Sequence, residues 1–239
     1  PGPRPSGPRP IPAAWEPREA TAPPAEWQGR AKDFLAGAVE TLWSERGAKL
    51  RQWLHDEKGL HDATIKGACL GLNLADKYEP RATWGLDPVF KEDGTDKKLW
   101  LPAGLVIPWV VNGDVHRLRF RRSDPGDGAR YVTASGSSMT PAAWNLERAA
   151  AVIVESELDG LLLSQEAGDL CAVVALGSAT SKTNKESHEL LRAMPVILIS
   201  LDTDEAGGDY SQVWQTHTRA YAAIEPISGR ELSSLDSFA

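Results

Sequence analysis

The stretch that decides the fold is AVIVESELDGLLL, residues 151–163, in which an apolar run stops at Glu155. A second acidic residue, Asp159, follows one helical turn later. Another apolar run, PVILISLDTDEAGG (residues 195–208), also ends in acidic residues and then glycines. Unbroken apolar runs of this length are typical of strands buried on both faces of a parallel sheet. The two runs therefore predict two strands of one sheet, each with carboxylates at its end.

From residue 151 onward, the pattern alternates strands with helices. Strands are predicted at residues 152–154, 172–176, 196–201 and 221–224. In an open parallel sheet, ligands bind at the carboxyl ends of the strands. Four candidate residues fall at such ends: Glu155, Gly177, Asp202 and Asp204. We expect them to gather along one edge of an α/β sheet.

Carboxylates gathered in this way repel one another unless a cation neutralises them. Oxygen ligands of this kind suit Mg²⁺ or Mn²⁺, which also bind substrate phosphates. The alternative is that Asp202 and Asp204 only cap a helix while Glu155 is a solvated loop residue. A glutamate, a glycine and a D-x-D-x-x-G segment at three successive strand ends favour the metal site.

The part of the chain before residue 151 has a different organisation. Residues 1–25 are proline-rich and predict a flexible linker. Apolar spacing then predicts helices, the last of them ending at Gly71. Residues 105–120 predict a β-hairpin around Asn112-Gly113, a pair that suits a type I′ turn. A further short strand is predicted at residues 131–133.

Composition excludes several classes of protein. The 239-residue chain has a net charge of −7, which argues against a generic nucleic-acid binder, but the charge is uneven. Residues 152–239 carry 14 acidic and 5 basic side chains, whereas HRLRFRR (residues 116–122) is strongly basic. Two cysteines are too few for a zinc site, so no zinc is expected. Without an apolar run long enough for a membrane span or a secretion signal, we expect a cytoplasmic protein with no membrane partner. The first residue is not methionine, which suggests a piece of a longer protein.

Three segments resemble the motifs of the Toprim fold, which bacterial-type primases, topoisomerases and certain nucleases share. These are Glu155 with Asp159, Leu176-Gly177-Ser178, and DTDEAG at residues 202–207. Earlier segments resemble DnaG-like primases in the same order. LRQWLHDEKGLHDATIKGACLGLNL (50–74) is similar to "YLxxRGL…I…FxLGY", LVIPWVVNGDVHRLRFRR (105–122) to "RVMFPIxDxxGRVIGFGGR", and GARYVTASGSS (128–138) to "PKYLNSPET".

The resemblance implies a primase catalytic core of two parts. Residues 26–150 would form a mixed α+β N-terminal subdomain, and residues 151–239 a Toprim domain, a Rossmann-like parallel sheet flanked by helices. Such an enzyme is a nucleotidyltransferase that synthesises short RNA primers on single-stranded DNA from ribonucleoside triphosphates. A replicative helicase is the implied partner, through regions outside this chain. The short, divergent core and the long proline-rich linker suggest a phage, a plasmid or another mobile element as the source.

The resemblance also assigns roles to residues. Glu155, Asp202 and Asp204 would hold catalytic Mg²⁺ or Mn²⁺, with Asp159 contributing to the same acidic edge. Contacts to nucleotides or nucleic acid would come from Arg119, Arg121, Arg130, Lys182 and Gly177. The sequence departs from the family near its end, where Glu231 and Asp236 only partly match a further acidic motif. A Toprim nuclease and a non-catalytic nucleic-acid-binding module therefore remain alternatives.

Overall fold

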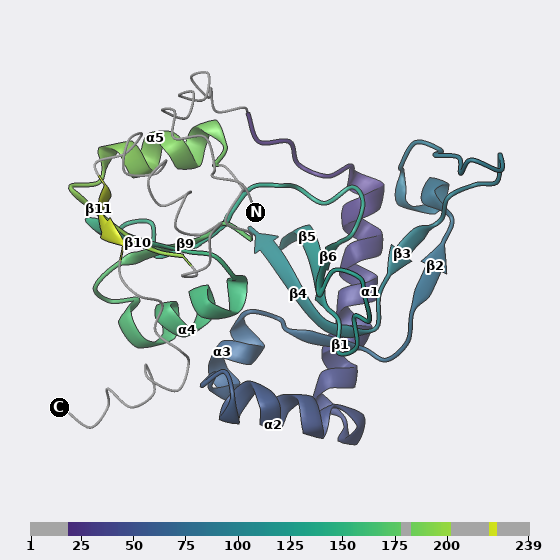
Figure 1. Ribbon diagram of the computed structural model, residues 1–239, viewed down its shortest axis with the longest axis horizontal. Helices are drawn as coiled ribbons and strands as arrows, with labels where there is room; N and C mark the ends of the chain where they lie inside the picture. The colour runs from purple at the N-terminus through teal and green to yellow at the C-terminus, as the bar shows by residue number, and fades with distance from the viewer. Residues whose placement is uncertain (1–18, 178–182, 202–219, 224–239) are drawn as a thin grey trace, which may run out of the picture.

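The computed structural model describes residues 19–177, 183–201 and 220–223, which are built around two main sheets (Figure 1). The first is a four-stranded antiparallel sheet, and the second is a five-stranded, mostly parallel sheet. A separate two-stranded ribbon of β2 (Lys77–Glu79) and β3 (Leu99–Leu101) projects beside the first sheet. Among the helices described, none has the length and apolar character needed to cross a membrane.

The antiparallel sheet contains the predicted hairpin. Its strand order is β1 (Gly71–Asn73), β4 (Gly104–Val111), β5 (Asp114–Arg121) and β6 (Tyr131–Thr133). Between β4 and β5, Asn112 and Gly113 have φ angles of 52° and 88°. A type I′ turn requires positive φ at both central residues, so the predicted turn is confirmed. The predicted strand at residues 131–133 is confirmed as β6.

The two faces of β5 have opposite character. Leu118 and Phe120 are fully buried in a core formed with the long helix α1 (Ala25–Trp43). Because side chains alternate along a strand, the residues between and beside them face the other way. Those residues are the arginines Arg117, Arg119 and Arg121. Strand β5 is thus apolar toward α1 and basic on its other face.

The helices that follow α1 differ in one respect from the sequence prediction. A short 3₁₀ turn (Glu45–Gly47) leads to α2 (Ala48–Asp56) and α3 (Asp62–Gly67), and a second 3₁₀ turn covers Arg81–Trp84. The prediction that the third helix ends at Gly71 was wrong. The chain turns at Cys69, which has a φ of 52°, and Gly71 then pairs with β4. Strand pairing satisfies the backbone there in place of a further helical turn.

The second sheet confirms the predicted strand–helix alternation. Its order is β11 (Ala220–Ala223), β10 (Val196–Ser200), β8 (Ala150–Val154), β9 (Ala172–Ala175) and β7 (Ala142–Trp144). The first four are parallel neighbours, and β7 adds an antiparallel edge. Two helices, α4 (Glu157–Ala167) and α5 (Lys185–Ala193), connect consecutive parallel strands. The helix predicted between residues 201 and 220 lies outside the described residues.

Helix α4 joins the two parts of the molecule. Its leucines pack in one cluster with residues of α1, α2, α3, β4 and the loops that follow α2 and α3. We name this cluster the shared core: Leu158, Leu161 and Leu162 with Leu42, Leu54, Leu60, Ile65, Leu70, Leu105 and Ile107. Gln165 of α4 reinforces this contact. Its side-chain oxygen accepts hydrogen bonds from the His61 amide at 2.8 Å and the Thr64 hydroxyl at 2.7 Å, and its nitrogen donates to the Gly59 carbonyl at 3.0 Å.

Candidate functional site

The carboxyl ends of the parallel strands bring together two predicted site residues. Val154 of β8 lies opposite Ala175 of β9 and Ser200 of β10, so the three strands end at one edge. Glu155 directly follows β8, and its carbonyl accepts a hydrogen bond from the Gly177 amide at 2.8 Å. The predicted convergence of Glu155 and Gly177 is therefore confirmed.

The described part of the structure does not place the other predicted acidic residues in a metal site. Asp159 lies in the first turn of α4, where its carboxylate accepts a hydrogen bond from the Ser156 hydroxyl at 2.6 Å. Ser156 in turn caps the helix by accepting from the Asp159 amide at 3.2 Å. Asp202 and Asp204 lie outside the described residues, as does Lys182. The residues that the structure describes contain no group of three or more acidic, histidine or cysteine side chains placed to hold a metal ion. The metal role of Asp159, Asp202 and Asp204 stays a prediction, as does the contact of Lys182 with nucleic acid.

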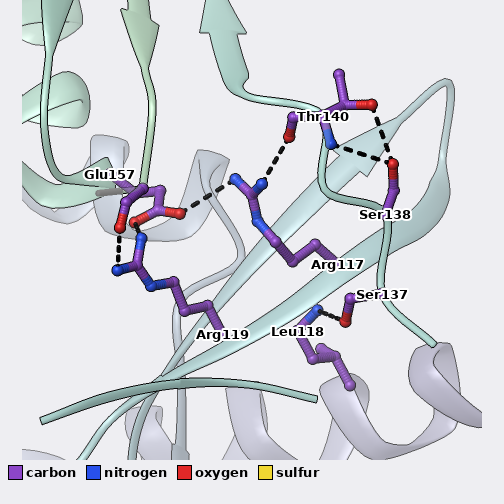
Figure 2. Close-up of polar contacts among 8 residues, drawn as sticks. Arg117, Leu118, Arg119, Ser137, Ser138, Thr140 and Glu157 are labelled. Atoms are coloured by element: carbon purple, nitrogen blue, oxygen red, sulfur yellow. Dashed lines mark hydrogen bonds and ion pairs between the residues drawn. The ribbon is translucent and has the colours of Figure 1, made fainter. Parts of the chain in front are cut away.

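Near this edge, two arginines of the antiparallel sheet enclose a buried carboxylate that belongs to α4. Figure 2 shows Arg117 and Arg119 of β5 converging on Glu157 in the first turn of α4. Arg119 Nη1 donates to Glu157 Oε2 at 2.6 Å, and Arg117 Nη2 lies 3.1 Å from Glu157 Oε1. The side chains of Glu157, Arg117 and Arg119 are 4%, 5% and 11% exposed. We name these three residues the Glu157 cluster.

The two ion pairs of the Glu157 cluster are not equivalent. Arg119 makes a true hydrogen bond to the carboxylate. Arg117 Nη2 and Glu157 Oε1 are close, yet neither atom has a hydrogen bond of acceptable geometry within the described residues. Burial lowers the pKa of the Arg117 guanidinium, the charge of Glu157 opposes that effect, and the charge of Arg119 adds to it. An arginine still remains protonated, so the cluster carries one buried positive charge in excess.

Arg119 also contacts the edge of the parallel sheet. Its Nη2 donates to the carbonyl of Gly177, the same residue whose amide bonds to Glu155. Gly177 has a φ of 85°, which residues other than glycine rarely adopt. A Cβ atom there would lie 2.8 Å from Arg119 Nη1, so a larger residue would also have to displace the end of that side chain.

We expect Gly177→Ala to lower the free energy of unfolding by about 1–3 kcal/mol, because it combines backbone strain with a clash against a buried side chain. Chemical denaturation followed by tryptophan fluorescence would measure the change. Gly94→Ala is a matched control, since Gly94 has a φ of 78° but open space around its Cβ position. Equal losses in the two variants would show that the contact with Arg119 has no energetic weight.

The other predicted basic residues lie farther along the same face or in the adjoining loop. The Arg121 guanidinium lies over the ring of Trp53 in α2, 4.4 Å from its centroid. Arg119 lies similarly over Tyr131, at 4.6 Å. Burial raises the pKa of the Tyr131 hydroxyl, and the charge and hydrogen bond of Arg121 oppose this shift. Arg130 is exposed in the loop before β6. Contacts of these arginines with nucleic acid stay predictions.

A separate pocket of about 440 Å³ lies near the Glu157 cluster. Residues 19–24, 136–140 and 183–184 line it. Thr140 of its lining connects it to the cluster, because the Thr140 carbonyl accepts a hydrogen bond from Arg117 Nη1 at 2.6 Å. The predicted site residues that the structure describes lie outside its lining.

Sequence reasoning did not identify Glu157 or Arg117 as special. The signal that was available is the alternation of arginines with apolar residues in β5, which puts the arginines on one buried face that must contain an anion. The position of that anion depends on how the two sheets pack, and the sequence pattern does not specify this packing.

No protein-family model matches the chain, and no curated protein matches it. Solved structures do. The RNA polymerase domain of Mycobacterium tuberculosis primase DnaG is 16% identical and superposes with a TM-score of 0.63, covering 90% of this chain and 80% of that one. A DNA primase domain from Pseudomonas aeruginosa is 18% identical, with a TM-score of 0.60 and coverage of 88% and 74%. A DnaG primase catalytic domain bound to single-stranded DNA is 16% identical and has a TM-score of 0.60. The match covers 89% of this chain and 76% of that one.

These similarities define the class of fold. The chain has the mixed α/β fold of DnaG-type primase catalytic cores, as the resemblance in its sequence predicted.

Proposed function

We propose that this chain is the catalytic core of a DNA primase, a nucleotidyltransferase that makes short RNA primers on single-stranded DNA. The observation that carries the proposal is the meeting of Glu155 and Gly177 at the edge of a parallel sheet, facing a sheet whose near face carries arginines. The primase fold supports it, and two of the similar DnaG structures contain single-stranded or overhanging DNA. Residues 26–150 then form the N-terminal subdomain and residues 151–239 the Toprim domain.

The donor chemistry of the acidic edge fits a hard divalent cation. Glu155 contributes carboxylate oxygen at a half-buried position, and the two aspartates that follow β10 in the sequence, Asp202 and Asp204, contribute the same chemistry. We propose that these three residues hold Mg²⁺ or Mn²⁺, with Asp159 supporting the start of α4 beside them. The ion would neutralise phosphate charge and orient the reacting oxygens.

The basic face supplies the opposite charge. Arg121 and the exposed Arg130 are the proposed contacts for the template backbone or the triphosphate, together with Lys182. Guanidinium groups suit this role because they pair with phosphate in bidentate geometry. The guanidinium of Arg121 packs on the ring of Trp53 in α2, which orients it. We further propose that the protein acts in the cytoplasm together with a replicative helicase on the same DNA.

A product assay tests the proposal. The protein is incubated with Mg²⁺ or Mn²⁺, labelled ribonucleoside triphosphates, and single-stranded DNA carrying a short annealed RNA primer. Extension of the primer that is lost in Asp202→Ala supports a primase. Shortened DNA would identify a Toprim nuclease, and retention of DNA with neither product would identify a non-catalytic binding module. Either of the last two results overturns the proposal.

A further inference from the structure

A single guanidinium links the two sheets at the proposed site. Arg119 of the antiparallel sheet is held by Glu157 through a 2.6 Å hydrogen bond and reaches the Gly177 carbonyl with its other terminal nitrogen. The Gly177 amide then bonds to the Glu155 carbonyl at 2.8 Å. The backbone at Glu155 is therefore connected through Gly177 to Arg119 of the basic face, and Glu157 of α4 holds that arginine in place (Figure 2 shows its ion pairs).

We propose that Arg119 and Glu157 are positioning residues for the reaction. Arg119, oriented by Glu157, fixes Gly177 and with it the backbone that presents Glu155. The effect on catalysis rests on the proposed function. The positioning of Gly177 by Arg119 rests on the observed hydrogen bonds alone. Neither residue needs to contact the substrate to act in this way.

Burial gives this connection its rigidity. Glu157 and Arg119 are almost fully removed from solvent, so water does not compete for their hydrogen bond. The planar guanidinium places its two terminal nitrogens at a fixed spacing, one toward the carboxylate and one toward the carbonyl. A lysine at the same position carries the charge but has one flexible ammonium group and cannot reproduce both fixed bonds.

Arg117 provides the internal comparison. It lies on the same face of the same strand and contacts the same carboxylate, but its hydrogen bond goes to the Thr140 carbonyl. It has no hydrogen bond to Gly177 among the described contacts. Removal of either arginine leaves the other to neutralise Glu157, so Arg117→Met and Arg119→Met should both fold.

The test compares Arg119→Met, Arg119→Lys and Arg117→Met in primer extension. We expect Arg119→Met to lower kcat at least tenfold, with KM for the nucleotide changing less than threefold. Arg119→Lys should recover thermal stability without recovering kcat. Arg117→Met should lose stability like Arg119→Met but keep kcat within threefold. Equal kcat losses in the two methionine variants, after correction for the folded fraction, would overturn the proposal.

A second readout is independent of activity. Hydrogen exchange of a peptide covering residues 169–177 should be faster in both Arg119 variants than in Arg117→Met, because Gly177 loses its anchor only in the former. If the wild-type protein makes no product, the proposed function is wrong and the exchange comparison alone decides the positioning role. Indistinguishable exchange in all three variants would then refute it.

Discussion

Glu157→Gln is expected to lower the free energy of unfolding by about 3–5 kcal/mol, the range for breaking a buried ion pair by removal of one partner. Glutamine keeps the size of the side chain but removes its charge. Arg117 and Arg119 would then be two buried cations 5% and 11% exposed, without the carboxylate that they share. Urea denaturation followed by circular dichroism measures the loss.

Two further variants make this result interpretable. Glu189→Gln changes an exposed glutamate on α5 and should alter stability by less than about 0.5 kcal/mol. A triple variant that replaces Arg117, Arg119 and Glu157 with methionine should recover much of the loss, since apolar side chains of similar volume can replace a buried charge cluster. A loss below about 1 kcal/mol in Glu157→Gln would show that water enters the cluster and screens the arginines.

Glu155→Gln is expected to lower the rate of primer extension about 100-fold, equivalent to about 2.7 kcal/mol of transition-state stabilisation. The amide has the shape of the carboxylate but no charge with which to balance a divalent cation. Because the Gly177 amide bonds to the backbone carbonyl of Glu155, that hydrogen bond should survive the substitution and the fold should be retained. Single-turnover extension of an annealed primer provides the rate.

Asp169→Asn is the matched control for Glu155→Gln. Asp169 is exposed and precedes β9, so it lies at the opposite edge of the parallel sheet from Glu155. Its replacement removes one negative charge from the same domain without touching the proposed site. Rates within threefold of each other for the two variants would exclude Glu155 as a metal ligand.

The parts of the fold that could be predicted from sequence are those determined by local patterns. Asn112-Gly113 specifies its turn through backbone preference, and the alternation of apolar runs with helices specifies the parallel strands. Edge elements were missed. Strands of three residues show little alternation, and among the described strands of that length only β6 was predicted, whereas β2, β3 and β7 were not. Gly71 begins a strand because β4 lies beside it, a contact distant in the sequence.

The candidate site, too, could be predicted only where local patterns determine it. Glu155 and Gly177 could be placed together because parallel strands end at a common edge, a rule that needs only the order of strands and helices. The pairing of Glu157 with Arg117 and Arg119 depends on how one sheet packs on the other. Glu157 lies 38 positions after Arg119 and 40 positions after Arg117 in the sequence. Local periodicity carries no information at that separation.

The shared core has a consequence for how the molecule folds. Leucines of α4 complete an apolar cluster whose other members all precede residue 108 in the sequence, so neither half can exclude water from that surface alone. The two sheets should therefore melt in one cooperative transition. In the proposed primase, the part that carries the acidic edge could therefore not loosen for exchange of product while the part that carries the arginine face stays folded, and any opening during turnover would have to occur within loops.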